Sequence, residues 1–116
     1  MCNRPPKRPR LEAIEQLEAL GLSAYAARTF VGLVELGTGT AKSVSNTVDV
    51  PRTRVYDAVE ELDDCGLVSV EETTPKRFSS VPPERACEVI EREYMGRITE
   101  LQRSLDALGR TDGPSE

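Results

Sequence analysis

The fold is decided by residues 40–66, which read TAKSVSNTVDVPRTRVYDAVEELDDCG. Thr40 is a residue type favoured at the N-cap of a helix. The apolar side chains after it recur at helical spacing, which predicts a brief helix over residues 41–48 that buries Ala41, Val44 and Val48. Residues 49 and 50 then form a tight connection to a second helix.

The second helix is predicted to run from residue 51 to about residue 65. Proline at position 51 suits the first helical turn, because the N–H that it lacks would be unpaired there anyway. Val55, Val59 and Leu62 have the i, i+4, i+7 spacing of an inward face, and Gly66 ends the helix. A short helix, a tight turn and a longer helix have the proportions of a helix-turn-helix.

Two more helices are predicted upstream. Residues 11–20 carry apolar side chains at three-residue steps, and Gly21 follows them. Ser23 is a favourable N-cap for the next helix, and Gly37 ends it. The inward face of that helix is expected to consist of Ala27, Phe30, Val31 and Val34. Residues 37–40 are predicted to be a loop.

Downstream, the sequence predicts a hairpin and a long helix. Residues 67–70 and 76–81 are expected to be the two strands of the hairpin, with the polar residues 71–75 at its tip. Pro82 and Pro83 end the hairpin, and the last helix is predicted over residues 83–108. The predicted fold class is mainly α with a small β-hairpin (α+β). Three helices followed by a hairpin is the order of a winged helix-turn-helix.

An apolar stripe on the last helix favours packing against another helix. From residue 98 onward its members are spaced by three, four and three residues, which is heptad spacing. We therefore expect residues 83–108 to be a dimerisation helix, followed by a disordered tail over residues 109–116. The alternative is that the stripe packs back on its own domain, residues 11–82. The expected interface residues are Ile90, Tyr94, Ile98, Leu101, Leu105 and Leu108.

The net charge of −5 hides an uneven distribution. Four of the 15 basic residues lie in the first ten positions, so the rest of the chain has 11 basic against 20 acidic residues, a net of −9. Three prolines and few apolar side chains predict that residues 1–10 are a flexible basic arm. Its charged residues are Arg4, Lys7, Arg8 and Arg10. The low lysine and high acidic content resembles halophilic archaeal proteins.

The composition disfavours several classes of protein. The chain has no histidine and no Gly-rich phosphate loop, so we expect no enzymatic activity. Cys2, Cys65 and Cys87 are far apart and form no CxxC pair, which disfavours a disulfide scaffold and a structural zinc site. No apolar run could span a membrane, and the N-terminus lacks the apolar centre of a signal peptide. We therefore expect a cytoplasmic protein without a cofactor, a metal or a small-molecule ligand.

Five short stretches carry a resemblance to a known family. They are Leu20-Gly21-Leu22-Ser23, Glu35-Leu36-Gly37, Val50-Pro51-Arg52-Thr53-Arg54-Val55-Tyr56-Asp57, Gly66-Leu67-Val68 and Pro75-Lys76-Arg77-Phe78. Over roughly residues 12–95 the sequence resembles the DNA-binding domain of the TrmB family of archaeal transcriptional regulators, and more distantly that of MarR-type regulators. The resemblance implies a DNA-binding module with its dimerising helix. In larger members a sugar-binding domain follows, for which we expect no room here.

The candidate recognition helix is the one that follows Pro51. Its candidate DNA-binding residues are Arg52, Thr53, Arg54, Tyr56 and Asp57. Either arginine could contact guanine through two hydrogen bonds or bind phosphate, and the sequence leaves this choice open. Glu60, Glu61, Asp63 and Asp64 would be repelled by phosphates, so we expect only the N-terminal end to enter the major groove. Alternatively, the arginines pair with Asp49, Asp57 or Glu61, and Tyr56 faces the core.

Three other segments are expected to support DNA binding. Thr40, Lys42, Ser43 and Ser45 begin the preceding helix and could donate to phosphates. Thr73, Thr74, Lys76 and Arg77 form a wing that would cross the minor groove. The basic arm would follow the backbone or enter a neighbouring minor groove. Alternatively, Lys76 and Arg77 are edge-strand charges that discourage aggregation, and the basic arm is a tail without function.

These features together predict a homodimer on a pseudo-palindromic promoter site, most simply a repressor. Its recognition helices are expected about one DNA turn apart, roughly 34 Å. Because the body is acidic, DNA binding should depend on salt weakly or in the reverse sense. Two alternatives stay open: a winged-helix adaptor that binds a protein of the transcription machinery, and a regulator whose cysteines respond to oxidants.

Overall fold

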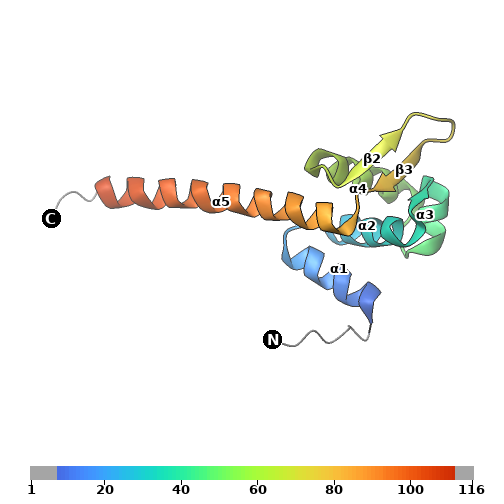
Figure 1. Ribbon diagram of the computed structural model, residues 1–116, viewed down its shortest axis with the longest axis horizontal. Coiled ribbons are helices and arrows are strands. Elements are labelled where there is room, and N and C mark those ends of the chain that lie inside the picture. Colours follow the sequence, from blue (N-terminus) through green and yellow to red (C-terminus); the bar gives the residue numbers. More distant parts are fainter. Residues whose placement is uncertain (1–7, 112–116) are drawn as a thin grey trace.

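The computed structural model describes residues 8–111. Residues 8–82 form a head, and one long helix runs away from it (Figure 1). In chain order the elements are α1 (Pro9–Ala19), α2 (Ala24–Leu36), β1 (Thr38–Gly39), α3 (Ala41–Thr47), α4 (Arg52–Cys65), β2 (Val68–Glu71), β3 (Arg77–Ser80) and α5 (Pro83–Thr111). The predicted fold class, a mainly helical winged helix with a long C-terminal helix, is confirmed. None of the helices in residues 8–111 is both long and apolar enough to cross a membrane.

The ends of the central helices follow from local capping chemistry. Ser23 Oγ accepts a hydrogen bond of 3.2 Å from the N–H of Ala26 at the start of α2. Gly37 and Gly66 follow α2 and α4 with φ of +83° and +82°, a region that favours glycine. These helix ends agree with the predicted ones to within a residue.

The first helix starts earlier than expected. α1 begins at Pro9, so Arg10, expected in the flexible arm, lies in a helix instead. Proline is well suited to the first helical turn, and Arg10 bonds to other parts of the head. Arg8 is exposed beside α1, whereas Arg4 and Lys7 lie outside the described residues. At the other end, α5 continues to Thr111, three residues into the expected disordered tail.

The sheet has a third strand that the sequence did not predict. β1 lies in the expected loop over residues 37–40 and pairs antiparallel with β3, giving the strand order β1-β3-β2. Phe78 of β3 is opposite Gly39 on one side and Val70 on the other. A two-residue strand has no visible alternation, so only its pairing with β3 identifies it.

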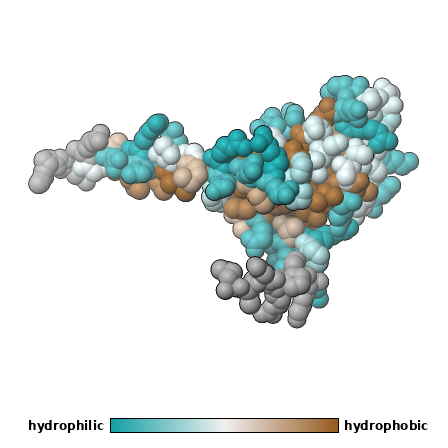
Figure 2. All heavy atoms as spheres, viewed as in Figure 1, coloured by the Kyte–Doolittle hydropathy of each residue, from teal (hydrophilic) through white to brown (hydrophobic). Residues whose placement is uncertain are grey.

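The core lies where the helices of the head meet the sheet. Its largest fully buried side chains include Phe78, Leu33, Leu62 and Leu67, and the predicted inward residues of α4 are buried among them. Val34 differs from its prediction, because it is 40% exposed at the edge of α2 that faces α1 and α5. Figure 2 shows hydrophobic surface here and along the lower edge of α5.

Candidate nucleic-acid interface

The start of α4 is anchored from one side and exposed on the other. Val55, Ala58 and Val59 are buried in the core. Arg52 and Thr53, which precede them, are exposed in the first helical turn. The exposed end is also the N-terminus of a helix, where unpaired N–H groups and the helix dipole favour an anion such as phosphate.

The two arginines of this turn are in different surroundings. Arg54 Nη1 lies 3.5 Å from Asp57 Oδ2, and the Arg54 guanidinium carbon is 5.9 Å from the ring centre of Tyr25 on α2. This is the surface pairing considered as the alternative for the arginines, and the ring adds a cation–π contact. Within residues 8–111, no carboxylate lies within ion-pair distance of Arg52. Tyr25 is 29 positions before Arg54, so no local pattern in the sequence indicates this contact.

Glu61 has another partner than an arginine. Its carboxylate accepts hydrogen bonds from the N–H of Ser23 at 3.1 Å and from Ser23 Oγ at 2.8 Å. The contact ties the second half of α4 to the start of α2. One of the four acidic groups expected to repel phosphate is therefore used to hold α4 in place.

Tyr56 lies between α4 and the hairpin. Its ring meets Phe78 edge-on, with ring centres 6.4 Å apart and planes at 83°, yet the residue is 49% exposed. About half of Tyr56 is therefore exposed, while its ring still packs on the core residue Phe78. The ring borders a groove of about 330 Å³ whose charged residues are Glu60, Asp63, Glu72 and Lys76. The groove between α4 and the wing is therefore acidic.

The start of α3 is held by a capping box. The N–H of Thr40 donates to Ser43 Oγ at 2.8 Å, and the N–H of Ser43 donates to Thr40 Oγ1 at 3.2 Å. Both hydroxyls thus stabilise the helix end. Lys42 is exposed, and Ser45 is partly exposed. Among the predicted residues of α3, Lys42 is the one with a free charge, as no carboxylate of the described chain pairs with it.

The wing has its own internal contacts. Thr73 Oγ1 donates to the carbonyl of Pro75 at 2.7 Å, and Lys76 Nζ lies 3.6 Å from Glu72. Thr74 and Arg77 are exposed, and no ion pair of Arg77 occurs in residues 8–111. Of the two wing cations, Arg77 is therefore the one without a nearby carboxylate.

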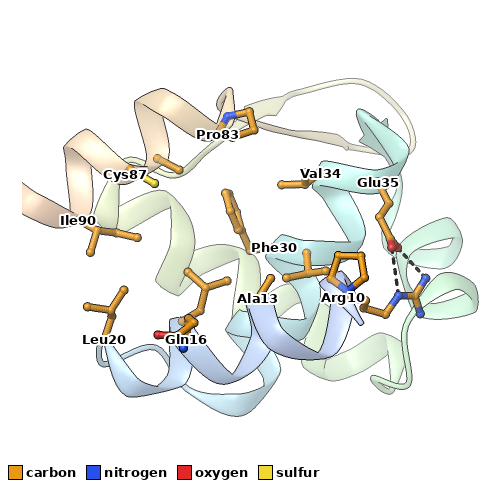
Figure 3. A pocket seen from close by; sticks show the side chains of 14 residues that line it. Arg10, Ala13, Gln16, Leu20, Phe30, Val34, Glu35, Pro83, Cys87 and Ile90 are labelled. Carbon is orange, nitrogen blue, oxygen red and sulfur yellow. Dashed lines mark hydrogen bonds and ion pairs between the residues drawn. The ribbon is translucent and has the colours of Figure 1, made fainter. Parts of the chain in front are cut away.

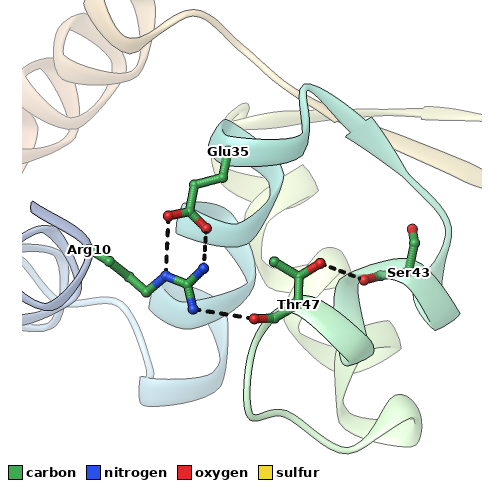
Figure 4. A network of polar contacts seen from close by, with 4 residues as sticks. All are labelled: Arg10, Glu35, Ser43 and Thr47. Atoms are coloured by element: carbon green, nitrogen blue, oxygen red, sulfur yellow. Dashed lines mark hydrogen bonds and ion pairs between the residues drawn. The ribbon is translucent and has the colours of Figure 1, made fainter.

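Arg10 joins α1 to the helix-turn-helix. Its guanidinium donates to both carboxylate oxygens of Glu35 on α2, at 2.6 and 3.1 Å, and to the carbonyl of Thr47 at the end of α3, at 3.2 Å (Figure 4). Thr47 Oγ1 in turn donates to the carbonyl of Ser43. The residue predicted to bind DNA from a flexible arm is instead a connection between three helices.

The expected interface stripe of α5 divides into two parts. Ile90 is partly buried against the head, and Tyr94 Oη lies 3.4 Å from the carbonyl of Ala19 on α1. The later members are 51–63% exposed: Ile98, Leu101, Leu105 and Leu108. Packing on the own domain, the alternative considered above, thus applies to the beginning of the stripe only.

An apolar pocket of about 420 Å³ lies where α5 leaves the head (Figure 3). It is bordered by Leu20 just after α1, by Phe30 and Val34 of α2, and by Cys87 and Ile90 of α5. Cys87 is exposed at this pocket. The sequence did not predict this pocket, because its walls come from three helices distant in the chain.

Cys65 is partly buried near the base of α5. Burial raises the pKa of its thiol, the negative charges of Glu93, Glu61 and Asp64 raise it further, and Arg97 opposes them. Cys65 and Cys87 are both free thiols. Residues 8–111 contain no group of three His, Cys, Asp or Glu side chains placed to bind a metal ion.

Comparison with known proteins adds to this geometry. Residues 17–84 match the family model described as the sugar-specific transcriptional regulator TrmB. TrmBL1 of Pyrococcus furiosus, described as an HTH-type sugar sensing transcriptional regulator, is 29% identical over 99 residues, or 85% of this chain and 29% of that protein. The chain therefore spans less than a third of that relative.

Solved structures show the same fold. The structure of TrmBL2, an archaeal chromatin protein described as showing a novel mode of DNA binding, has a TM-score of 0.81 at 22% identity, over 88% of this chain and 41% of that one. A MarR family transcriptional regulator from Silicibacter pomeroyi DSS-3 has a TM-score of 0.53 at 18% identity, over 87% and 74% of the two chains. The first is described as a chromatin protein and the second as a transcriptional regulator.

Proposed function

The chain belongs to the TrmB family of transcriptional regulators, and from this premise we propose that it binds a pseudo-palindromic promoter site in double-stranded DNA as a homodimer. The observation that carries the proposal is the exposed first turn of α4, where Arg52 has no carboxylate partner within the described chain. Occupation of the promoter by the dimer makes repression the simplest outcome.

Arg52 is the residue that we assign to the DNA bases or the nearest phosphate. Thr53 beside it can donate its hydroxyl to the backbone. Arg54 acts from a fixed position, because Tyr25 and Asp57 hold its side chain against α2. Tyr56 and Asp57 complete the exposed face of this turn. The acidic second half of α4 stays outside the groove.

The flanking elements position the helix on the DNA backbone. Lys42 supplies charge at the start of α3, where Thr40, Ser43 and Ser45 provide a rigid helix end. Arg77, Lys76, Thr73 and Thr74 are the proposed contacts of the wing. Arg8, together with Arg4 and Lys7 outside the described residues, would follow the backbone. Such contacts fix the register of the protein on DNA without reading its sequence.

The exposed stripe of α5 is the proposed dimer interface. Ile98, Leu101 and Leu105 are each more than half exposed along one face of α5, and a partner helix would remove them from water. A two-fold symmetric dimer then presents two α4 helices to a site with matching symmetry.

The test is a titration of fragments from the chain's own promoter region, read by gel shift. Arg52→Ala should weaken binding by about 5- to 150-fold, which corresponds to the roughly 1–3 kcal/mol of a bidentate base contact. Arg103→Ala is the matched control, since Arg103 is an exposed arginine on α5 and should change nothing. Equal affinities of the wild type and Arg52→Ala, or no shifted complex at any salt concentration, would contradict the proposal.

A protein-binding adaptor is the second candidate, and the acidic groove between α4 and the wing favours it. Glu60, Asp63 and Glu72 face this groove against a single lysine. Glu60→Lys separates the two functions: it should leave DNA binding intact or strengthen it, whereas it should abolish the capture of a basic protein partner.

A further inference from the structure

Four of the six exposed large apolar residues of α5 are arranged symmetrically about one point of the helix, whereas Met95 and Leu108 have no apolar counterpart across that point. That point is the peptide between residues 99 and 100. Ile98 and Leu101 are equally far from it, and so are Tyr94 and Leu105. These four residues are 39–56% exposed on one stripe. In an antiparallel pair of identical helices, positions equidistant from the two-fold axis face one another, so the stripe complements an inverted copy of itself.

The head blocks a parallel arrangement. α1 lies on the stripe side of α5, where Tyr94 Oη meets the carbonyl of Ala19 and Leu20 shares a pocket with Ile90 (Figure 3). In Figures 1 and 2, α1 lies below α5 and the hydrophobic edge of α5 faces the same way. In a parallel pair the partner's entire head would have to fit beside α1 on this side, whereas in an antiparallel pair only the end of one helix does.

The net negative charge of the heads also favours an antiparallel pair. Residues 8–82 contain 12 acidic and 8 basic residues, so each head has a net charge of −4. A parallel pair would place two such heads side by side. An antiparallel pair separates them by many Debye lengths, each about 8 Å at physiological ionic strength.

We infer that the two copies pair through antiparallel α5 helices, an inference that rests on the homodimer proposed above. Leu105 of the second copy packs on Tyr94, and Leu101 packs on Ile98. The end of the second α5 then reaches the rim of the apolar pocket at Leu20 and completes it. Each head is thus covered by the bare end of the other copy's helix.

This arrangement sets the spacing of the DNA half-sites. Pro83 lies 16.5 residues before the midpoint of the stripe, so the two Pro83 residues of the dimer are about 50 Å apart along the helix axis at 1.5 Å per residue. The half-sites are therefore more than one DNA turn apart, which replaces the one-turn spacing expected from the sequence.

Disulfide trapping tests the orientation. In a background with Cys2→Ser, Cys65→Ala and Cys87→Ser, the Tyr94→Cys and Leu105→Cys proteins are purified separately, mixed and oxidised. An antiparallel pair gives the mixed disulfide alone, because identical cysteines lie about 16 Å apart, beyond the roughly 7 Å between Cα atoms that a disulfide spans. A parallel pair gives the two homodisulfides and no mixed product.

Glu93→Cys mixed with Asp106→Cys is the matched control. These positions are also equally far from the midpoint but lie off the stripe, so no disulfide should form. Sedimentation of the reduced proteins separates the possible failures. A dimer that gives homodisulfides, or no mixed disulfide, overturns the antiparallel pairing and leaves the homodimer standing. A monomer overturns both.

Discussion

Arg10 of α1 donates two hydrogen bonds to the carboxylate of Glu35 on α2, at 2.6 and 3.1 Å, and a third to the carbonyl of Thr47 on α3. Two parallel N–H···O contacts to one carboxylate fix both distance and orientation. The residue at the start of the chain thus sets how α1 sits against the helix-turn-helix. α1 also forms part of the surface that we propose to face a second copy, so this contact would connect the two proposed functional regions of the head.

The Arg10–Glu35 contact should be measurable as a coupling energy. A double-mutant cycle with Arg10→Ala and Glu35→Ala should give a coupling of up to about 1 kcal/mol in the free energy of unfolding, limited because the side chains are 48% and 39% exposed. Arg10→Lys is the control, since it keeps the charge without the paired donors. The measurement is urea denaturation. A coupling of zero in low salt would contradict the role assigned to Arg10.

Thr29 offers a prediction of increased stability. Thr29 is fully buried in α2, and its Oγ1 atom has no hydrogen-bond partner within the described residues. Thr29→Val replaces this hydroxyl by a methyl group of similar shape, so the free energy of unfolding should rise by about 1 kcal/mol. Thr29→Ser keeps the hydroxyl and loses the methyl group, so it should lower stability. A Thr29→Val protein less stable than the wild type would show that the hydroxyl has a partner in solution.

The helices could be predicted from the sequence because their signals are local. Ser23 and Gly37 delimit α2, and Gly66 ends α4, each through the backbone geometry of one or two neighbouring residues. The heptad spacing after Ile98 likewise predicted an exposed stripe. The family resemblance was confirmed by the match over residues 17–84.

What the sequence could not predict depends on pairs distant in the chain. β1 is a strand only because β3 lies beside it. Arg10 meets Glu35 across 25 positions, and Tyr25 meets Arg54 across 29. A charge pattern shows which residues are ionised but not which two share a surface. The arm and the arginines were therefore the parts of the predicted site that the structure altered most.

The thiol of Cys65 should react slowly with alkylating agents. Burial, followed by the charges of Glu93, Glu61 and Asp64, raises its pKa, so the thiolate is scarce near neutral pH. At pH 8 it should react with iodoacetamide more slowly than the exposed Cys87, as measured by peptide mass spectrometry. Because the unfolded chain loses this proton first, near pH 8.5, the contribution to stability is present below that pH and declines as pH rises through the pKa of the folded state.

The Cys65→Ala variant isolates the contribution of the Cys65 thiol to stability. Above about pH 8.5, the free energy of unfolding should fall more in the wild type than in this variant. Below that pH, the free energies of unfolding of the two proteins should depend on pH in the same way. Equal alkylation rates for Cys65 and Cys87 would contradict the direction of the pKa shift.

The acidic body predicts an unusual salt dependence of DNA binding. Residues 11–116 carry a net charge of −9, which repels DNA at low salt, and salt screens this repulsion. Counterion release at the few phosphate contacts acts in the opposite direction. The dissociation constant should therefore change little, or fall, as KCl rises from about 0.1 M towards the molar range. Fluorescence anisotropy with a labelled duplex measures it, and a steep conventional loss of affinity would exclude the halophilic adaptation.

Selection of bound sequences from random duplex DNA tests sequence-specific recognition by the first turn of α4 most directly. The wild type should enrich a site with two-fold related halves, more than one helical turn apart. Arg52→Ala should lose or relax the preference at a symmetric pair of positions, while Arg103→Ala enriches the same site as the wild type. If the wild type enriches no sequence over the starting pool across the salt range, or Arg52→Ala enriches an identical site, the recognition assigned to α4 is wrong.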